Sequence, residues 1–174
     1  VPCQYDKVES FNYGVARVEQ NEKWGFLNTK GEIVVPCQYD KVESFNYGLA
    51  RVEQNGKWGF LNTKGEIVIP CKYNQVGSFS EGMARVKQNG KWGFLNTIGE
   101  IVIPCEFQNV TDFKEGLVRV KQNGKWGFIN KQGEIVIPCE FQNVSDFKKG
   151  LAKVEQKGKS YFINKNVIRV NKRK

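Results

Sequence analysis

The sequence has no histidine and only four aspartates. Without histidine, the chain cannot build a Ser-His-Asp or Cys-His catalytic arrangement, or a metal site that uses imidazole. A glycine-rich phosphate loop is also missing. The aspartates occupy two different positions of a sequence repeat and form no evident acid/base pair; they are Asp6, Asp40, Asp112 and Asp146. These absences predict a protein that is not an enzyme and has no cofactor.

The chain also lacks long apolar runs, since none approaches the ~20 residues of a membrane-spanning helix. Residues 1–10 show neither the basic start nor the apolar stretch of a secretory signal peptide. We therefore expect no membrane span and a cytoplasmic location. Because the sequence opens at Val1 without an initiator methionine, we also expect a fragment of a longer protein.

The 174 residues are enough for one domain with a substantial core, and the aromatic share of 13% is that of a folded protein. We expect a single, monomeric domain over residues 1–174. The net charge of +9 is uneven, because residues 137–174 hold ten of the 27 basic residues and three of the 18 acidic ones. This basic end, with its tail at 171–174, suits an anionic partner, but a solvated face is the favoured interpretation.

A repeat of 34 residues organises the chain. All five cysteines and all four tryptophans recur at this spacing, which is typical of solenoids, propellers and arrays. In the fifth repeat the phrase Lys-Trp-Gly-Phe is degraded to Lys159-Ser160-Tyr161-Phe162. The predicted repeats are 1–34, 35–68, 69–102, 103–136 and 137–170.

Each repeat predicts about four short strands joined by tight turns. Asn55-Gly56 is a hairpin signal, because both residues tolerate the positive φ of a type I′ turn. Pro70 is expected to stop the third strand or to mark a sheet edge. With no helical period anywhere, the predicted fold class is all-β, antiparallel and meander-like. The strands are expected at 49–54, 57–62, 66–69 and, for the one after the proline, 39–45.

The hairpin also predicts a register. Counting outward from Asn55-Gly56 pairs Arg51 with Phe60, Val52 with Gly59 and Glu53 with Trp58. Gly59 leaves a hole on one face of the sheet, where we expect a neighbouring repeat to come close. Each sheet is therefore expected to bury both faces against its neighbours.

Two architectures satisfy these strands. The favoured one is a small five-bladed β-propeller in which the N-terminal strand completes the last blade. The alternative is an open β-hairpin solenoid. The five copies of each strand, and the lack of distinct capping repeats with a polar outer face, favour closure.

The repeats resemble the WG-repeat family of bacterial proteins, whose units pair a Lys-Trp-Gly-Phe hairpin with Gly-Glu-Ile-Val-Ile-Pro and a following Tyr-Asp. Repeats one to four carry this pattern, and the resemblance covers essentially the whole chain. It implies a β-repeat module used in varied contexts, without a shared enzymatic activity. We expect the Trp-Gly pairs to be packing joints between repeats; they are Trp24, Gly25, Trp58, Gly59, Trp92, Gly93, Trp126 and Gly127.

A cation recurs at one place in every repeat, beside aromatic residues. Its stem is suited to packing against those rings, and its charge is suited to an acidic or phosphate-bearing ligand. The lysines of Lys-Trp-Gly-Phe form a second series, which we expect to be solvated. The candidate ligand-facing cations are Arg17, Arg51, Arg85, Arg119 and Lys153.

The cysteines are expected to be small, inert thiols in a reducing compartment. Their number is odd, and equivalent positions of adjacent repeats are expected to lie too far apart for a disulfide. No close Cys pair points to zinc, and a ring of thiols around a soft metal is a less favoured alternative. They are Cys3, Cys37, Cys71, Cys105 and Cys139.

These features together favour a non-catalytic repeat domain that acts as a protein–protein interaction scaffold, with a protein partner that the sequence does not identify. One alternative is a glycan- or choline-binding module that uses the tryptophan rings as platforms. Another is a binder of anionic partners, nucleic acid or lipid, through the basic fifth repeat.

Overall fold

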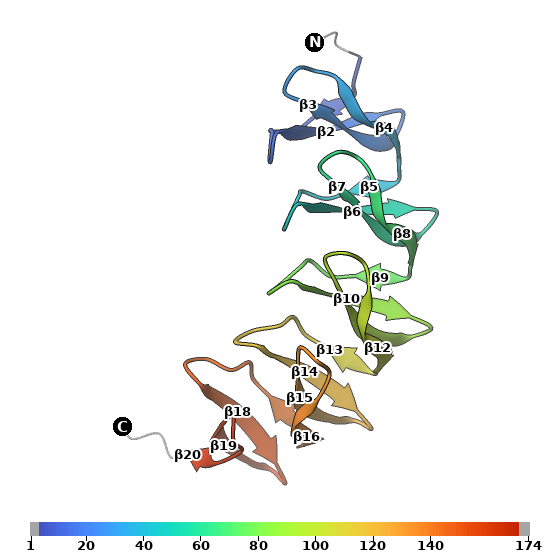
Figure 1. Ribbon diagram of the computed structural model, residues 1–174. Helices are drawn as coiled ribbons and strands as arrows, with labels where there is room; N and C mark the ends of the chain where they lie inside the picture. Colours follow the sequence, from blue (N-terminus) through green and yellow to red (C-terminus); the bar gives the residue numbers. More distant parts are fainter. Residues whose placement is uncertain (1–3, 171–174) are drawn as a thin grey trace. The chain divides into compact units, whose positions relative to one another are not determined.

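A computed structural model describes residues 4–170 of the chain (Figure 1). This part forms five antiparallel sheets of four strands each and contains no helix, hence none that is long and apolar enough to cross a membrane. The all-β prediction of five antiparallel repeats is confirmed. Cys3 and the predicted basic tail at 171–174 lie outside the described residues.

Every sheet is a simple meander of consecutive strands. The first contains β1 (Lys7–Val8), β2 (Val15–Gln20), β3 (Lys23–Asn28) and β4 (Ile33–Tyr39). The second contains β5 (Lys41–Val42), β6 (Leu49–Gln54), β7 (Lys57–Asn62) and β8 (Ile67–Tyr73). The third contains β9 (Gln75–Val76), β10 (Met83–Gln88), β11 (Lys91–Asn96) and β12 (Ile101–Phe107). The fourth contains β13 (Asn109–Val110), β14 (Leu117–Gln122), β15 (Lys125–Asn130) and β16 (Ile135–Phe141). The fifth contains β17 (Asn143–Val144), β18 (Leu151–Gln156), β19 (Lys159–Asn164) and β20 (Arg169–Val170).

Strand β1 pairs with β2, and the fifth sheet takes all four of its strands from β17 to β20. The prediction that the N-terminal strand completes the last blade is therefore wrong. The chain divides into two compact units: unit 1 runs to Ser78 and includes Thr97–Gly99, and unit 2 holds Phe79–Asn96 and the residues from Glu100 on. The expectation of a single domain stays a prediction.

The central hairpin forms as predicted. Strands β6 and β7 pair Arg51 with Phe60, Val52 with Gly59 and Glu53 with Trp58. Asn55 and Gly56 have φ angles of 54° and 72°, the left-handed conformation that both positions of a type I′ turn require. A local turn thus fixes which side chains share a face.

The third strand of each sheet is longer than predicted. Strand β8 passes through Pro70 and ends at Tyr73, and the fourth predicted strand shrinks to Lys41–Val42. Proline is tolerated because β8 lies at the edge of its sheet, where a missing N–H breaks no ladder. The pairing shifts within β8, since Trp58 lies opposite Tyr73 and Phe60 opposite Ile69. The extra residues form a bulge around Pro70.

This bulge explains the glycine of Trp-Gly. A Cβ atom added to Gly59 would lie 2.7 Å from the backbone nitrogen of Cys71 and 2.8 Å from the carbonyl carbon of Pro70. The backbone that approaches Gly59 therefore belongs to β8 of the same sheet. Residues 69–71 belong by sequence to the predicted repeat 69–102, so the neighbouring repeat approaches Gly59 as a strand of the same sheet. The role of the Trp-Gly pairs as joints between repeats stays a prediction.

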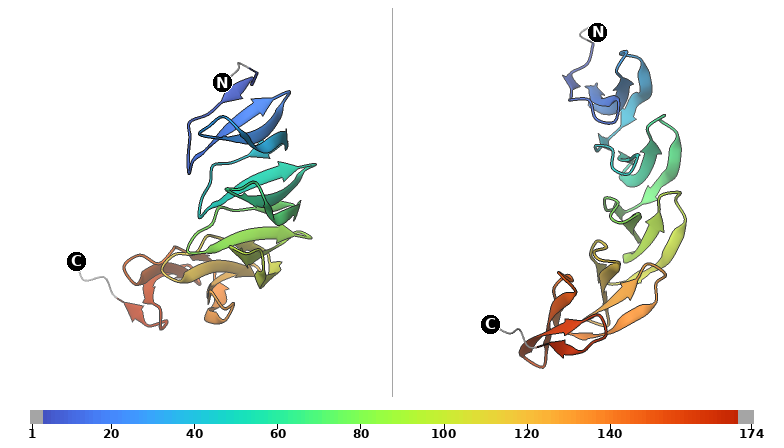
Figure 2. Two further views of the ribbon diagram at one scale, coloured as in Figure 1. Left: turned by 45° about the horizontal axis from the view of Figure 1, so that its top comes forward. Right: turned by 60° about the vertical axis from the view of Figure 1, so that its left-hand side comes forward.

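A glycine that allows close approach of a neighbouring sheet lies in the next turn. Gly65, between β7 and β8, has a φ of 82°, and a Cβ atom there would lie 2.6 Å from the carbonyl oxygen of Val34 in β4 of the preceding sheet. Gly99 approaches Ile69 in the same way. Within unit 1 the sheets β1–β4 and β5–β8 follow one another along the chain (Figure 2).

The apolar core lies between consecutive sheets. In unit 1, Phe26 and Val35 of the first sheet cluster with Phe45 and Ala50 of the second, all buried. The rings of Phe26 and Phe45 have centroids 5.1 Å apart at 58°. Burying a phenylalanine contributes about 1.5–3 kcal/mol, so one such ring per joint is a large part of the contact between two sheets.

Candidate interaction surface

The predicted ligand-facing arginines reach from one sheet to the next. Arg51 lies on β6, and its Nη1 atom donates a hydrogen bond of 3.0 Å to the carbonyl oxygen of Val76 on β9. The same bond recurs from Arg17 to Val42 at 3.1 Å and from Arg119 to Val144 at 2.9 Å. Each of these side chains thus connects its own sheet to the first strand of the following sheet.

Acidic side chains also form ion pairs with the arginines. Glu9 pairs with Arg17 and Glu43 pairs with Arg51, in each case within one sheet. In unit 2 the acid comes instead from the following sheet, and Asp112 lies 3.5 Å from Nε of Arg85. Since the arginine charges are already balanced, their geometry favours a role in joining sheets. A ligand-facing role for this series stays a prediction.

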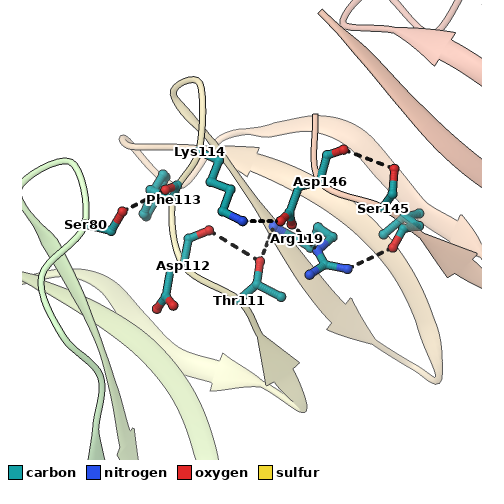
Figure 3. A network of polar contacts seen from close by, with 9 residues as sticks. Ser80, Thr111, Asp112, Phe113, Lys114, Arg119, Ser145 and Asp146 are labelled. Carbon is teal, nitrogen blue, oxygen red and sulfur yellow. Dashed lines mark hydrogen bonds and ion pairs between the residues drawn. The ribbon is translucent and has the colours of Figure 1, made fainter. Parts of the chain in front are cut away.

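The joint between the fourth and fifth sheets shows the arrangement in full (Figure 3). Asp146 forms an ion pair with Nε of Arg119 at 2.7 Å and accepts a hydrogen bond from Nζ of Lys114 at 2.6 Å. Ser145 Oγ donates to the carbonyl oxygen of Asp146 at 3.0 Å, which holds the acidic segment in place. Two cations from one sheet therefore clamp a single carboxylate of the next.

Lys153 holds the arginine position in the fifth sheet. Its side chain is exposed, and its backbone N–H donates to Ser145 Oγ at 2.9 Å. It therefore differs from the four arginines, which are only 21–35% exposed.

Each tryptophan ring lies beside two cations. An arginine of the neighbouring strand and a lysine both lie within 5.5–6.0 Å of the ring centroid. In the first sheet these cations are Arg17 and Lys7 around Trp24, and in the third they are Arg85 and Lys87 around Trp92. The rings are half-buried, and Trp24 also packs on the core. Their π-faces are thus engaged by the protein's own charges.

The cysteine thiols lie on the bulged edge strands. Cys71 is half-buried, and its Sγ donates to the carbonyl oxygen of Val52 at 3.7 Å. Burial raises the pKa of the Cys71 thiol, as it does for Cys37, Cys105 and Cys139. Over residues 4–170 no group of three metal-ligating side chains comes together.

One exposed isoleucine recurs in four sheets, at the first residue of the long edge strand. In unit 1, Ile33 and Ile67 are 60% and 62% exposed; in unit 2, Ile101 and Ile135 are 44% and 63% exposed. The fifth sheet has Arg169 at this place. We call the four residues the isoleucine series. Sequence reasoning missed it, although the alternation within Glu-Ile-Val-Ile places this isoleucine and the valine after it on opposite faces.

The family model described as "WG containing repeat" matches five consecutive segments, at residues 1–24, 24–58, 58–92, 92–126 and 126–159. The chain belongs to the WG-repeat family. The family resemblance drawn from Lys-Trp-Gly-Phe is thereby confirmed, and the match extends into the degraded fifth repeat. A search of curated proteins gives no match.

Among solved structures, this WG-repeat chain is similar to Hsv2 from Kluyveromyces yeasts. The K. lactis protein with loop 6CD replaced by a Gly-Ser linker aligns with a TM-score of 0.52 and 11% identity, over 91% of this chain and 62% of the other. The K. marxianus protein gives 0.50 and 12% over 98% and 63%. The WG-repeat chain thus spans less than two thirds of their length. Since Hsv2 is a β-propeller, the similarity supports the predicted propeller fold.

Proposed function

We propose that this WG-repeat chain is a non-catalytic scaffold for protein–protein interactions. The observation that carries the proposal is the isoleucine series, Ile33, Ile67, Ile101 and Ile135. Single exposed apolar residues are common on protein surfaces. Here the same large side chain is exposed at the same place of two consecutive sheets in each compact unit, which offers a partner a pair of equivalent apolar contacts on either unit.

The charged residues support this choice of surface. The arginines and the tryptophans are engaged with each other and with neighbouring acids, as at Arg51, Trp58 and Glu43. A glycan- or choline-binding module needs open aromatic faces. The two cations beside each ring compete with a ligand cation for the same π-face, so the arrangement favours a protein partner on the isoleucine series.

Site-specific photo-cross-linking tests the proposal. A benzoylphenylalanine residue replaces Ile67 in cells of the natural source, and the same residue at Lys64, which is also exposed, provides the control. We expect discrete cross-linked products at position 67 that protease removes and that nuclease and glycosidase leave intact. Products that only nuclease or glycosidase removes, or equal products at both positions, would overturn the proposal.

A further inference from the structure

Three of the five central hairpins turn on the same four residues, Gln-Asn-Gly-Lys. In each of these turns the asparagine has a φ of 50–54° and the glycine a φ of 72–79°, and both residues are exposed. Because the local sequence and the local conformation are shared, a difference in reactivity among the turns must come from the contacts around each one. The three pairs are Asn55-Gly56, Asn89-Gly90 and Asn123-Gly124.

An asparagine that precedes a glycine can react with its own backbone, since no Cβ atom shields the glycine nitrogen. This nitrogen loses its proton to the solvent and attacks the side-chain carbonyl carbon, Cγ, of the asparagine. The new N–Cγ bond displaces the amide nitrogen, which takes a proton from water and leaves as ammonia. Water then opens the cyclic imide, at Cγ to give aspartate or at the main-chain carbonyl to give isoaspartate. The reaction thus consumes water, releases ammonia and needs no oxidant.

The glycine nitrogen of the fourth sheet is held by a side chain. The backbone N–H of Gly124, between β14 and β15, donates to Oε1 of Gln108 at 2.8 Å. The N–H must leave this acceptor before it can lose its proton to the solvent. The hydrogen bond therefore slows the first step of the reaction at Asn123.

A carboxylate takes the corresponding place in the second repeat. Asp40 stands at the sequence position of Gln108, and its Oδ2 atom accepts from the backbone N–H of Asn55 at 2.7 Å. An aspartate is ionised at neutral pH. Its negative charge beside the turn disfavours the anion that must form on the nitrogen of Gly56. The reaction at Asn55 is slowed in this way.

The turn between β10 and β11 has neither of these contacts. Asn74 stands at the sequence position of Asp40 and Gln108. Among residues 4–170, no side chain accepts a hydrogen bond from the backbone N–H of Asn89 or Gly90. Since Gly90 is exposed, its N–H is open to the solvent.

We propose that Asn89 is a site of spontaneous covalent modification, at which aspartate or isoaspartate replaces the asparagine. Asn89 reacts faster than Asn55 and Asn123. An isoaspartate carries the main chain through an extra carbon atom, so the two-residue turn loses the type I′ geometry that sets the pairing of β10 with β11. The modification thus acts on one hairpin of unit 2, and it does not depend on the scaffold role.

Mass spectrometry of the full chain, incubated at neutral pH for several weeks, tests the proposal. Cleavage after glutamate gives each turn a peptide of its own, at residues 54–66, 82–100 and 116–134. The rates in urea are the reference, since identical neighbours should make the three asparagines react alike there. In the folded chain we expect Asn89 to react at least about fivefold faster than Asn123, the factor that one net hydrogen bond contributes. Equal rates in the folded chain, or no product at Asn89, would overturn the proposal.

A substitution at Gln108 tests the cause of the difference. Gln108 is exposed, so Gln108→Ala should keep the fold; we expect the reaction at Asn123 to become about fivefold faster, while Asn89 of the same molecule keeps its rate. Gln142→Ala is the matched control, because Gln142 accepts from the Gly158 N–H at 3.2 Å but no asparagine precedes that glycine. A wild-type rate at Asn123 in folded Gln108→Ala, or the same acceleration in Gln142→Ala, would contradict the proposed protection.

Discussion

Arg51 and Val76 lie 25 positions apart, yet the Arg51 guanidinium donates to the Val76 carbonyl across the gap between two sheets. Hydrogen bonds from charged groups contribute about 1.5–3 kcal/mol when partly buried, and this side chain is 21% exposed. We therefore expect Arg51→Met to lower the free energy of unfolding by about 2 kcal/mol, as measured by urea denaturation.

The control for this prediction is the same position in the fifth repeat. Lys153 is exposed, so Lys153→Met is expected to change the free energy of unfolding by less than about 0.5 kcal/mol. Equal losses for the two variants would show that the arginine does not stabilise the joint between sheets.

Gly59 is expected to be less replaceable than Gly56, the other glycine of the same hairpin. Gly59→Ala drives a methyl group into the backbone of Pro70 and Cys71, and overpacking against rigid atoms costs about 1–3 kcal/mol or more. Gly56→Ala meets no atom within 4 Å and costs only its left-handed φ, about 1 kcal/mol. Thermal unfolding of the two variants checks the order, and a Gly56 variant that is the less stable would contradict it.

Val167 occupies the position of Gly65, Gly99 and Gly133 in the last repeat, with a φ of 61°. A β-branched residue in this region is strained by about 1–3 kcal/mol. We expect Val167→Gly to stabilise the chain by about 1 kcal/mol, since the relief of strain exceeds the entropy that glycine adds to the unfolded chain. Val167→Ala, which keeps a Cβ atom, is expected to gain less. A lower melting temperature for Val167→Gly would show that the turn is not strained.

The pKa of the Asp40 carboxyl group lies below its ordinary value, first because Lys23 donates to it and second because the backbone N–H of Asn55 does. A carboxylate with a lowered pKa in the folded state stabilises above the unfolded pKa, near 4, and this contribution is lost as the pH falls through the folded value. Lys23→Met is expected to raise the Asp40 pKa in an NMR titration. Lys57→Met, in the next sheet, is expected to leave the Asp40 pKa unchanged. An Asp40 pKa that is the same in both variants and in the wild type would contradict the ion pair between Lys23 and Asp40.

Burial raises the pKa of the Cys71 thiol, so a smaller fraction is thiolate at neutral pH. Alkylation by iodoacetamide should therefore be slower in the folded chain than in urea. The alkylation rate of the folded chain should also level off at a higher pH than the rate of a free thiol. Equal rates in the folded and unfolded chains would refute the inert character of these cysteines.

The hairpin register was predictable because it depends on two adjacent residues. Asn55-Gly56 fixes the turn, and every pair from Gln54–Lys57 outward follows by counting. The close approach of backbone atoms to Gly59 was not predictable, because it depends on the bulge at Pro70, which lies eleven positions away on another strand. The sequence shows that a glycine is needed there but not what fills the space.

The joint between sheets could be predicted only in part. The sequence showed a recurring cation, Arg51, near Trp58. The acceptor for Arg51 is the backbone carbonyl of Val76, and because every residue has such a carbonyl, the sequence does not indicate which one is used. The exposed isoleucines were predictable from the alternation within Glu-Ile-Val-Ile, which places successive side chains on opposite faces of the strand. Their exposure follows from the pleat of β8, whose start lies at the sheet edge beside Leu61 of β7.

The central claim is that a protein partner binds the isoleucine series. Calorimetric titration of the partner found at position 67 against two forms of the chain tests it most directly: the wild type, and a variant with serine at Ile33, Ile67, Ile101 and Ile135. Because these side chains are largely exposed, the variant should keep its fold by circular dichroism. We predict that its affinity falls at least about a hundredfold, as the loss of several apolar contacts implies; an unchanged affinity in a folded variant would contradict the account.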